Sequence, residues 1–95
     1  MIQIQDHGPA IRELRLNRPP ANALSPDLIA ALTEAVRAAP GDGMRALILS
    51  GSPGRFSGGL DVPLLVDLDR AATSAVWGSF YDLMQALAAS TIPIA

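Results

Sequence analysis

The chain contains no cysteine and no lysine among its 95 residues. Without cysteine there is no disulfide, no thiolate nucleophile and no cysteine-bound metal, which fits a reducing compartment and leads us to expect a cytoplasmic protein. All seven basic residues are arginines spread singly along the chain, and the net charge is −2. Because nucleic-acid-binding surfaces need clustered basic residues, we expect no nucleic-acid partner.

Long hydrophobic runs are missing as well. No stretch approaches about 18 consecutive apolar residues, and the first residues lack the basic and then apolar pattern of a signal peptide, so we expect no membrane association. The single histidine, His7, falls in a predicted turn, and no cluster of metal-ligating residues or organic cofactor motif is present. With 49% hydrophobic and 17% charged residues, the chain can still bury the core of one small domain.

Hydrophobic periodicity predicts an α/β fold. Residues 2–5 and 11–16 alternate as two strands of a hairpin, in which Glu13 and Arg15 are expected to face solvent. Ser25 followed by Pro26 and Asp27 is a typical helix start, and an apolar stripe runs from there until residues 40–43 end the helix. On this helix we expect the polar side chains to be solvated: Thr33, Glu34 and Arg37.

The second half of the chain repeats the alternation of strand and helix. Residues 44–50 form an apolar strand that should be buried on both faces. Asp61 should cap a short helix, and Asp69 or Thr73 should cap a longer one that ends near residue 89, before a strand at 91–95. The long helix carries one predicted core stripe, made of Val76, Trp77, Phe80, Leu83, Met84 and Leu87.

A glycine-rich loop between strand and helix organises the rest of the chain. Residues 46–62 read ALILSGSPGRFSGGLDV, with glycine at 51, 54, 58 and 59. A P-loop would need Lys and Ser/Thr where Leu60 and Asp61 stand, and no G-x-G-x-x-G string for a dinucleotide is present. The remaining use for exposed loop amides is to stabilise a developing oxyanion, as in acyl-transfer and enolate chemistry.

Four strings in the chain resemble one family. RFSGGLDV is similar to the F-[SC]-[AG]-G-x-D loop of the enoyl-CoA hydratase/isomerase (crotonase) superfamily, and LNRPPANALS, ALILSG and ASTIPIA resemble its neighbouring strand segments in the same order. The resemblance spans essentially all 95 residues. It implies a crotonase-like ββα spiral of which residues 1–95 would be the N-terminal part, with the fold incomplete at Ala95.

The resemblance also implies a site. The backbone N–H of Leu60 would be one of two donors to a thioester carbonyl, and the family often has alanine where Gly58 stands. Asp61 is interpreted as the helix cap, with a catalytic role as the alternative, and Arg18 as either a partner of a coenzyme A phosphate or a solvated charge. The implied substrate-binding residues are Ala21, Asn22, Ala23, Leu24, Gly58, Gly59, Leu60, Asp61 and Val62.

The implied function is the acyl-CoA-binding half of an enoyl-CoA hydratase or isomerase of fatty acid metabolism, which stabilises a thioester enolate through backbone amides. Coenzyme A would enter as part of the acyl-CoA substrate, with no separate cofactor, and the chain would form a homo-oligomer, a trimer or a hexamer. The second donor and the acid–base glutamates would lie after Ala95. The alternatives are a catalytically silent binding or assembly module, or another activity of the family such as acyl-CoA hydrolysis.

Overall fold

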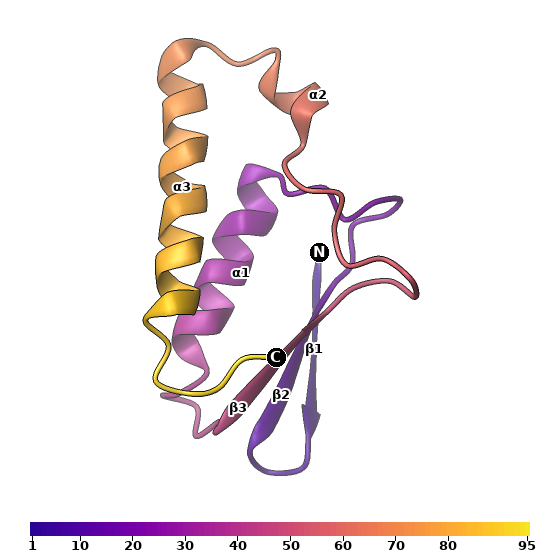
Figure 1. The fold of residues 1–95 in the computed structure, drawn as a ribbon, viewed down its shortest axis with the longest axis vertical. Helices are drawn as coiled ribbons and strands as arrows, with labels where there is room; N and C mark the ends of the chain where they lie inside the picture. Colours follow the sequence, from indigo (N-terminus) through magenta and orange to yellow (C-terminus); the bar gives the residue numbers. More distant parts are fainter.

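The computed structural model describes all 95 residues (Figure 1). An initial hairpin is followed by a helix, a strand, a short helix and a long helix, as the periodicity predicts. The elements in chain order are β1 (Ile2–His7), β2 (Ile11–Leu16), α1 (Pro26–Ala38), β3 (Ala46–Ser50), α2 (Val62–Leu65) and α3 (Arg70–Ala88).

The three strands form one sheet in the order β1-β2-β3, with β1 antiparallel to β2 and β2 parallel to β3. The parallel pair is possible because α1 carries the chain back between β2 and β3. The predicted strand at 91–95 is present as a short parallel bridge between Ile94 and Leu47, in which the Leu47 N–H donates to the carbonyl of Pro93 at 2.9 Å. The C-terminal segment therefore extends the sheet beyond β3.

The core lies between the sheet and α1, with α3 packed against α1 (Figure 1). From the sheet, Leu14, Leu16 and Leu47 contribute fully or almost fully buried side chains. Each such leucine contributes roughly 1.5–3 kcal/mol of burial free energy. The predicted apolar stripe of α1 is confirmed: its buried members are Leu28, Ile29, Leu32 and Val36.

The N-cap of α1 is also as predicted. The Ser25 side chain accepts a hydrogen bond from the Leu28 N–H at 3.2 Å, and the backbone of Ser25 is extended, with φ −82° and ψ 163°. The hydroxyl satisfies one of the N–H groups that a helix start leaves without an intrahelical partner.

We therefore expect Ser25→Ala to lower the free energy of unfolding by about 1 kcal/mol, which corresponds to roughly 4–8 °C in melting temperature for a domain of this size. Thermal denaturation followed by circular dichroism measures the change. An unchanged melting curve would show that the cap contributes nothing.

Glu13 corrects the sequence-based expectation, because it is buried rather than solvated. Only 8% of the residue is exposed, and its carboxylate binds the hydroxyl of Ser50, the His7 ring at 2.7 Å and the Arg15 guanidinium at 3.2 Å. His7 and Ser50 are diagonal neighbours of Glu13 on the adjacent strands, since the sheet register pairs Glu13 with Gln5 and Ile48, whereas Arg15 lies two positions further along β2. The Ser50 hydroxyl, followed by His7, lowers the pKa of Glu13 to about 2.

The lowered pKa has a consequence for stability at acid pH. A carboxylate with a lower pKa in the folded state stabilises the fold above its ordinary pKa of 4.5, and that contribution is lost as pH falls towards 2. We expect the melting temperature to fall across this interval and Glu13→Gln to make the fall shallower. Equal pH profiles for the two proteins would contradict the role of Glu13.

The two long helices also depart from the expected pattern. Thr33 is buried at 8% exposure, not solvated, and its hydroxyl donates to the Ile29 carbonyl at 2.8 Å. On α3 the buried residues are Val76, Leu83 and Ala86, whereas Trp77 is 53% and Met84 41% exposed. The predicted stripe is therefore wider than the face that packs. Strand β3 also differs from the expectation that it is buried on both faces. Leu47 is buried, but Ile48 on the other face is 36% exposed.

Candidate functional site

The glycine loop and the segment before α1 lie side by side, as the resemblance implies. The N–H of Leu24 donates to the Gly59 carbonyl at 2.8 Å, and the N–H of Asp61 donates to the Leu24 carbonyl at 3.1 Å. These two bonds form a parallel bridge between Leu24 and Leu60. One step earlier, the Gly58 N–H donates to the carbonyl of Ala21 at 2.8 Å. The structure thus brings together the two groups of predicted substrate-binding residues, 21–24 and 58–62.

One amide in the second group has no partner within the protein. Gly58 and Asp61 donate across the bridge, Val62 donates to the Leu60 carbonyl at 2.9 Å, and Gly59 donates to the Ser57 hydroxyl at 3.0 Å. The N–H of Leu60 makes no hydrogen bond with the chain. The two hydrogen bonds of the bridge are made by the Gly59 carbonyl and the Asp61 N–H. The N–H of Leu60, which lies between them, therefore points away from the 21–24 segment. Leu60 is therefore the donor that remains available to an outside acceptor.

Two of the loop glycines are required by the backbone. Gly59 has φ +92°, a conformation that residues with a Cβ rarely adopt. A Cβ on Gly51 would lie 2.5 Å from the carbonyl oxygen of Phe56. The loop therefore folds back on itself at Gly51 and turns at Gly59 immediately before the Leu60 amide.

Asp61 is a cap and an ion-pair partner. One carboxylate oxygen accepts from the Leu64 N–H at 3.3 Å at the start of α2, which confirms the predicted cap. The other lies 2.8 Å from the Arg18 guanidinium, which also donates to the Ala23 carbonyl at 2.9 Å. Arg18 is consequently not a solvated charge, and the carboxylate of Asp61 is already engaged on both oxygens.

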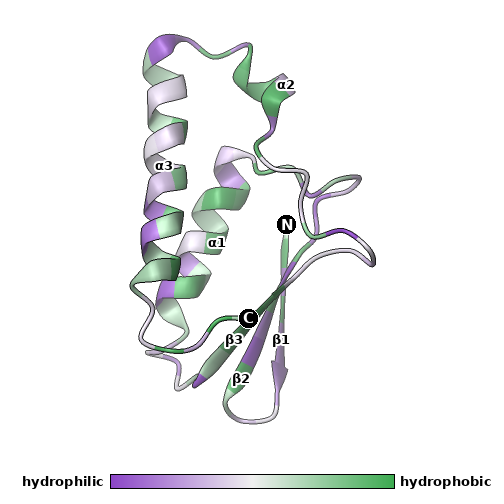
Figure 2. Ribbon diagram, viewed as in Figure 1, coloured by the Kyte–Doolittle hydropathy of each residue, from purple (hydrophilic) through white to green (hydrophobic).

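A cleft of about 370 Å³ adjoins the bridge. Its lining includes Ala21 and Ala23, whose N–H groups make no hydrogen bond within the chain. The wall of the cleft formed by Leu60 and the start of α2 is apolar. Helix α2 is hydrophobic (Figure 2), and its first residue, Val62, lines the cleft and is 59% exposed. The cleft therefore combines unpaired backbone donors with an apolar wall. The full lining is Arg18, Pro19, Pro20, Ala21, Ala23, Leu60, Asp61, Val62 and Pro63.

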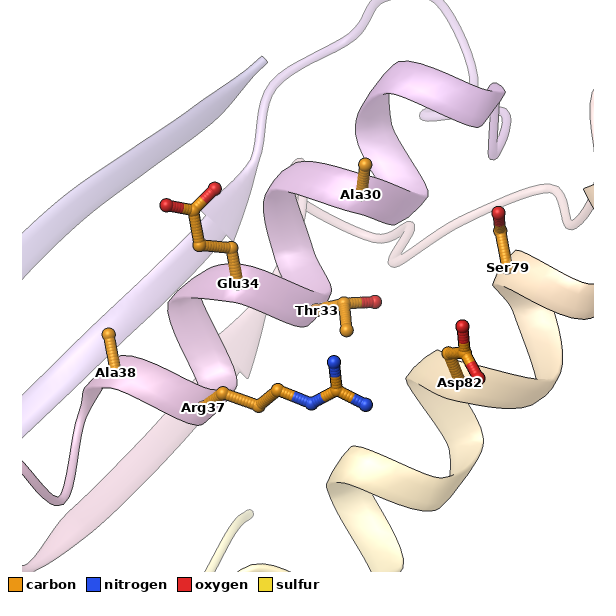
Figure 3. A pocket seen from close by; sticks show the side chains of 7 residues that line it. All are labelled: Ala30, Thr33, Glu34, Arg37, Ala38, Ser79 and Asp82. Atoms are coloured by element: carbon orange, nitrogen blue, oxygen red, sulfur yellow. The ribbon is translucent and has the colours of Figure 1, made fainter.

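A larger groove of about 520 Å³ lies between α1 and α3, away from the glycine loop (Figure 3). Arg37 and Asp82 point toward one another across it, and Thr33, Glu34 and Ser79 complete its polar lining. Its walls are the sides of two helices, where the backbone amides are used by the helix itself. It offers no free backbone donor, so we place the candidate site at the glycine loop.

Sequence reasoning did not find the roles of Asn22 and Ser57 in this region. Asn22 was expected among the substrate-binding residues, yet it is only 1% exposed. Ser57 had no predicted role, yet its hydroxyl donates to the Asn22 carbonyl at 2.7 Å. Asn22 has φ +52°. Asparagine is enriched among non-glycine residues with positive φ, so the residue type was the available signal for this structural role.

The structure brings no group of three or more His, Asp or Glu side chains into an arrangement that could hold a metal ion. None of its helices combines the length and hydropathy needed to cross a bilayer.

Comparison with solved structures places this architecture among known folds. Pseudomonas aeruginosa DspI is 25% identical, with a TM-score of 0.88 over 98% of this chain and 38% of its own. An enoyl-CoA hydratase from Mycobacterium smegmatis is 29% identical, with a TM-score of 0.85 over 98% of this chain and 37% of its own. Human mitochondrial delta3-delta2-enoyl-CoA isomerase is 24% identical, with a TM-score of 0.91 over the same two shares.

The predicted crotonase-like α/β fold is therefore confirmed, and the chain spans somewhat more than a third of the length of these structures. No curated protein sequence matches the chain. A sequence profile of the enoyl-CoA hydratase/isomerase family matches residues 6–95, which is nearly the whole chain. The protein belongs to the enoyl-CoA hydratase/isomerase family.

Proposed function

We propose that the chain binds an acyl-CoA thioester at the glycine loop and stabilises its enolate through the backbone N–H of Leu60. The observation that carries this proposal is the unpartnered Leu60 amide beside a cleft with an apolar wall. A thioester carbonyl gains negative charge as an α-proton leaves, and a fixed N–H donor strengthens its bond to that oxygen as the charge develops.

The cleft suits the remainder of such a ligand. The free N–H groups of Ala21 and Ala23 can bind the amide carbonyls of a pantetheine chain, and the apolar side chains of Leu60 and Val62 can pack against the acyl chain. Coenzyme A would thus enter as part of the substrate. In the same proposal, Asp61 positions α2 and does not transfer protons, because both of its oxygens are engaged.

The first test is a comparison of two ligands that differ at the reacting atom. Crotonyl-CoA should bind, whereas the butyl thioether of coenzyme A, which lacks the carbonyl, should bind several-fold to about tenfold more weakly, the scale of one hydrogen bond. Titration calorimetry measures both affinities. Equal affinities, or no binding of either compound, would reject the carbonyl-binding role.

A turnover assay then separates the enzyme from a silent binding module. Loss of the enoyl absorbance of crotonyl-CoA reports hydration, and a 3-enoyl-CoA substrate reports isomerisation. Turnover of either substrate supports an enzyme of the hydratase or isomerase type. Binding with neither reaction and without release of free coenzyme A would favour the silent module, whereas release of free coenzyme A would favour acyl-CoA hydrolysis.

The family also motivates a proposal on assembly. We expect a homo-oligomer, and the exposed aromatic and sulfur-containing side chains of α3 provide apolar area for it: Trp77, Tyr81 and Met84. Light scattering coupled to size-exclusion chromatography gives the molar mass directly, and a monomer at all accessible concentrations would exclude this assembly.

A further inference from the structure

Asn22 connects the two segments of the candidate site. It is 1% exposed and has φ +52°. Its side-chain amide donates to the Phe56 carbonyl at 2.9 Å, and its side-chain carbonyl accepts from the Arg18 N–H at 2.8 Å. Its backbone N–H donates to the Arg18 carbonyl at 2.8 Å. One buried side chain thus ties the segment before α1 to the carbonyl of a residue four positions before Leu60.

A second connection runs through Ser57. The Ser57 hydroxyl donates to the Asn22 backbone carbonyl at 2.7 Å and accepts from the Gly59 N–H at 3.0 Å. A hydroxyl can do both because it has one donor and two acceptor lone pairs. The result is a chain of hydrogen bonds from Asn22 through Ser57 to the amide immediately before that of Leu60.

Every polar group of Asn22 is occupied within the protein, so Asn22 has nothing left to offer a ligand. We propose that Asn22 is a positioning residue, which fixes the Ser57–Gly59 turn so that the N–H of Leu60, alone among those of residues 58–62, stays unpaired. This inference rests on the proposed function for its catalytic consequence. The positioning itself is a property of the ligand-free protein.

Three variants separate the parts of this arrangement. Asn22→Asp keeps the acceptor and the tolerance for positive φ but removes the donor to Phe56. Asn22→Gly keeps the backbone conformation and removes the whole side chain. Ser57→Ala removes the link to Gly59 without touching Asn22. Ser25→Ala serves as the matched control, since it destabilises α1 and leaves all of these bonds in place.

Amide hydrogen exchange measured by NMR tests the positioning in the absence of ligand. In the unsubstituted protein the Gly58 and Gly59 amides should be protected and the Leu60 amide should exchange rapidly. Asn22→Gly and Ser57→Ala should each reduce protection at Gly59 by about tenfold or more, the loss expected from one net hydrogen bond. Ser25→Ala should not. Unchanged protection at Gly59 in both loop variants would overturn the proposal.

Steady-state kinetics of the same variants test the catalytic consequence. A displaced donor should lower kcat for enoyl-CoA by about 10- to 100-fold, with a much smaller change in KM, because misplacement by about 1 Å acts mainly on the transition state. Asn22→Asp should fall between the unsubstituted protein and Asn22→Gly. If the unsubstituted protein neither binds nor converts acyl-CoA, the proposed function fails and this catalytic consequence falls with it. If the unsubstituted protein binds and converts acyl-CoA and the Asn22 variants have the same kcat, the positioning role is wrong and the proposed function stands.

Discussion

Replacing Leu60 by proline should reduce turnover of enoyl-CoA in the full chain at least about 100-fold further than replacing it by alanine. Proline deletes the backbone N–H, and loss of one oxyanion donor typically costs about 10²–10³ in rate. Alanine retains the amide and only trims the wall of the cleft, so it should mainly alter the preference for acyl chain length. Steady-state kinetics of the two variants give the comparison.

The structure makes this substitution a sharper test than a proline normally provides. Proline usually removes a hydrogen bond from the fold, but the Leu60 N–H makes none within the chain, so no internal bond is lost. Circular dichroism should confirm that the variant is folded. Near-normal rate constants in a folded Leu60→Pro protein would rule out the donor, and equal losses in both variants would implicate the side chain instead.

Infrared spectroscopy of bound crotonyl-CoA provides a readout that does not require turnover. A donor to the thioester oxygen lengthens the C=O bond, so its stretching band should move to lower frequency on binding. The shift should persist in Leu60→Ala and be clearly smaller in Leu60→Pro, which removes one of the two expected donors. A shift of the same size in both variants would show that another donor holds the oxygen.

The features that the sequence predicted well are those set by neighbouring residues. The caps at Ser25, Asp61 and Asp69 each bind an amide three positions along the chain, so the signal is contained in a few adjacent letters. The turn at residues 58–59 is local in the same sense, because glycine is the residue that reaches its backbone angles without strain.

The features that it missed depend on partners far away in the chain. Glu13 looked solvated because its strand alternates, but Ser50 lies 37 positions further on and completes the buried site. The Asn22 side chain reaches Phe56, 34 positions away. No pattern within a strand or a loop contains these pairings, since they arise only when the sheet register and the two loops are brought together.

Helix α3 shows a third kind of difference. Its apolar residues follow helical periodicity correctly, but periodicity gives the width of an apolar stripe and not the part of it that a neighbour covers. Val76 and Leu83 are buried, and Leu83 belongs to the same core cluster as the apolar residues of α1, while Trp77 stands half exposed, with its ring edge-on to Phe80 at a centroid distance of 6.2 Å. The position of the neighbouring helix decides which apolar residues of α3 are buried, and the sequence of α3 does not specify that position.

Gly58→Ala and Gly59→Ala, which are adjacent and chemically identical changes, should have opposite outcomes. A Cβ at Gly58 would lie 3.4 Å from the Cβ of Ala21, which is ordinary contact, and the hydrogen bond from its amide to the Ala21 carbonyl would remain. We therefore expect Gly58→Ala to retain the stability and turnover of the unsubstituted protein within a few-fold.

A Cβ at Gly59 meets no atom within 4 Å, so crowding is not the difficulty at this position; the backbone is. At φ +92° an alanine is strained by roughly 1–2 kcal/mol, and relaxing that strain rotates the peptide that carries the Leu60 N–H. Gly59→Ala should thus lose about tenfold or more in kcat while remaining folded, because a misdirected donor no longer meets the oxyanion. Comparable kinetics for the two alanine variants would mean that the orientation of this peptide does not govern the reaction, and the proposed role of the Leu60 amide would have to be abandoned.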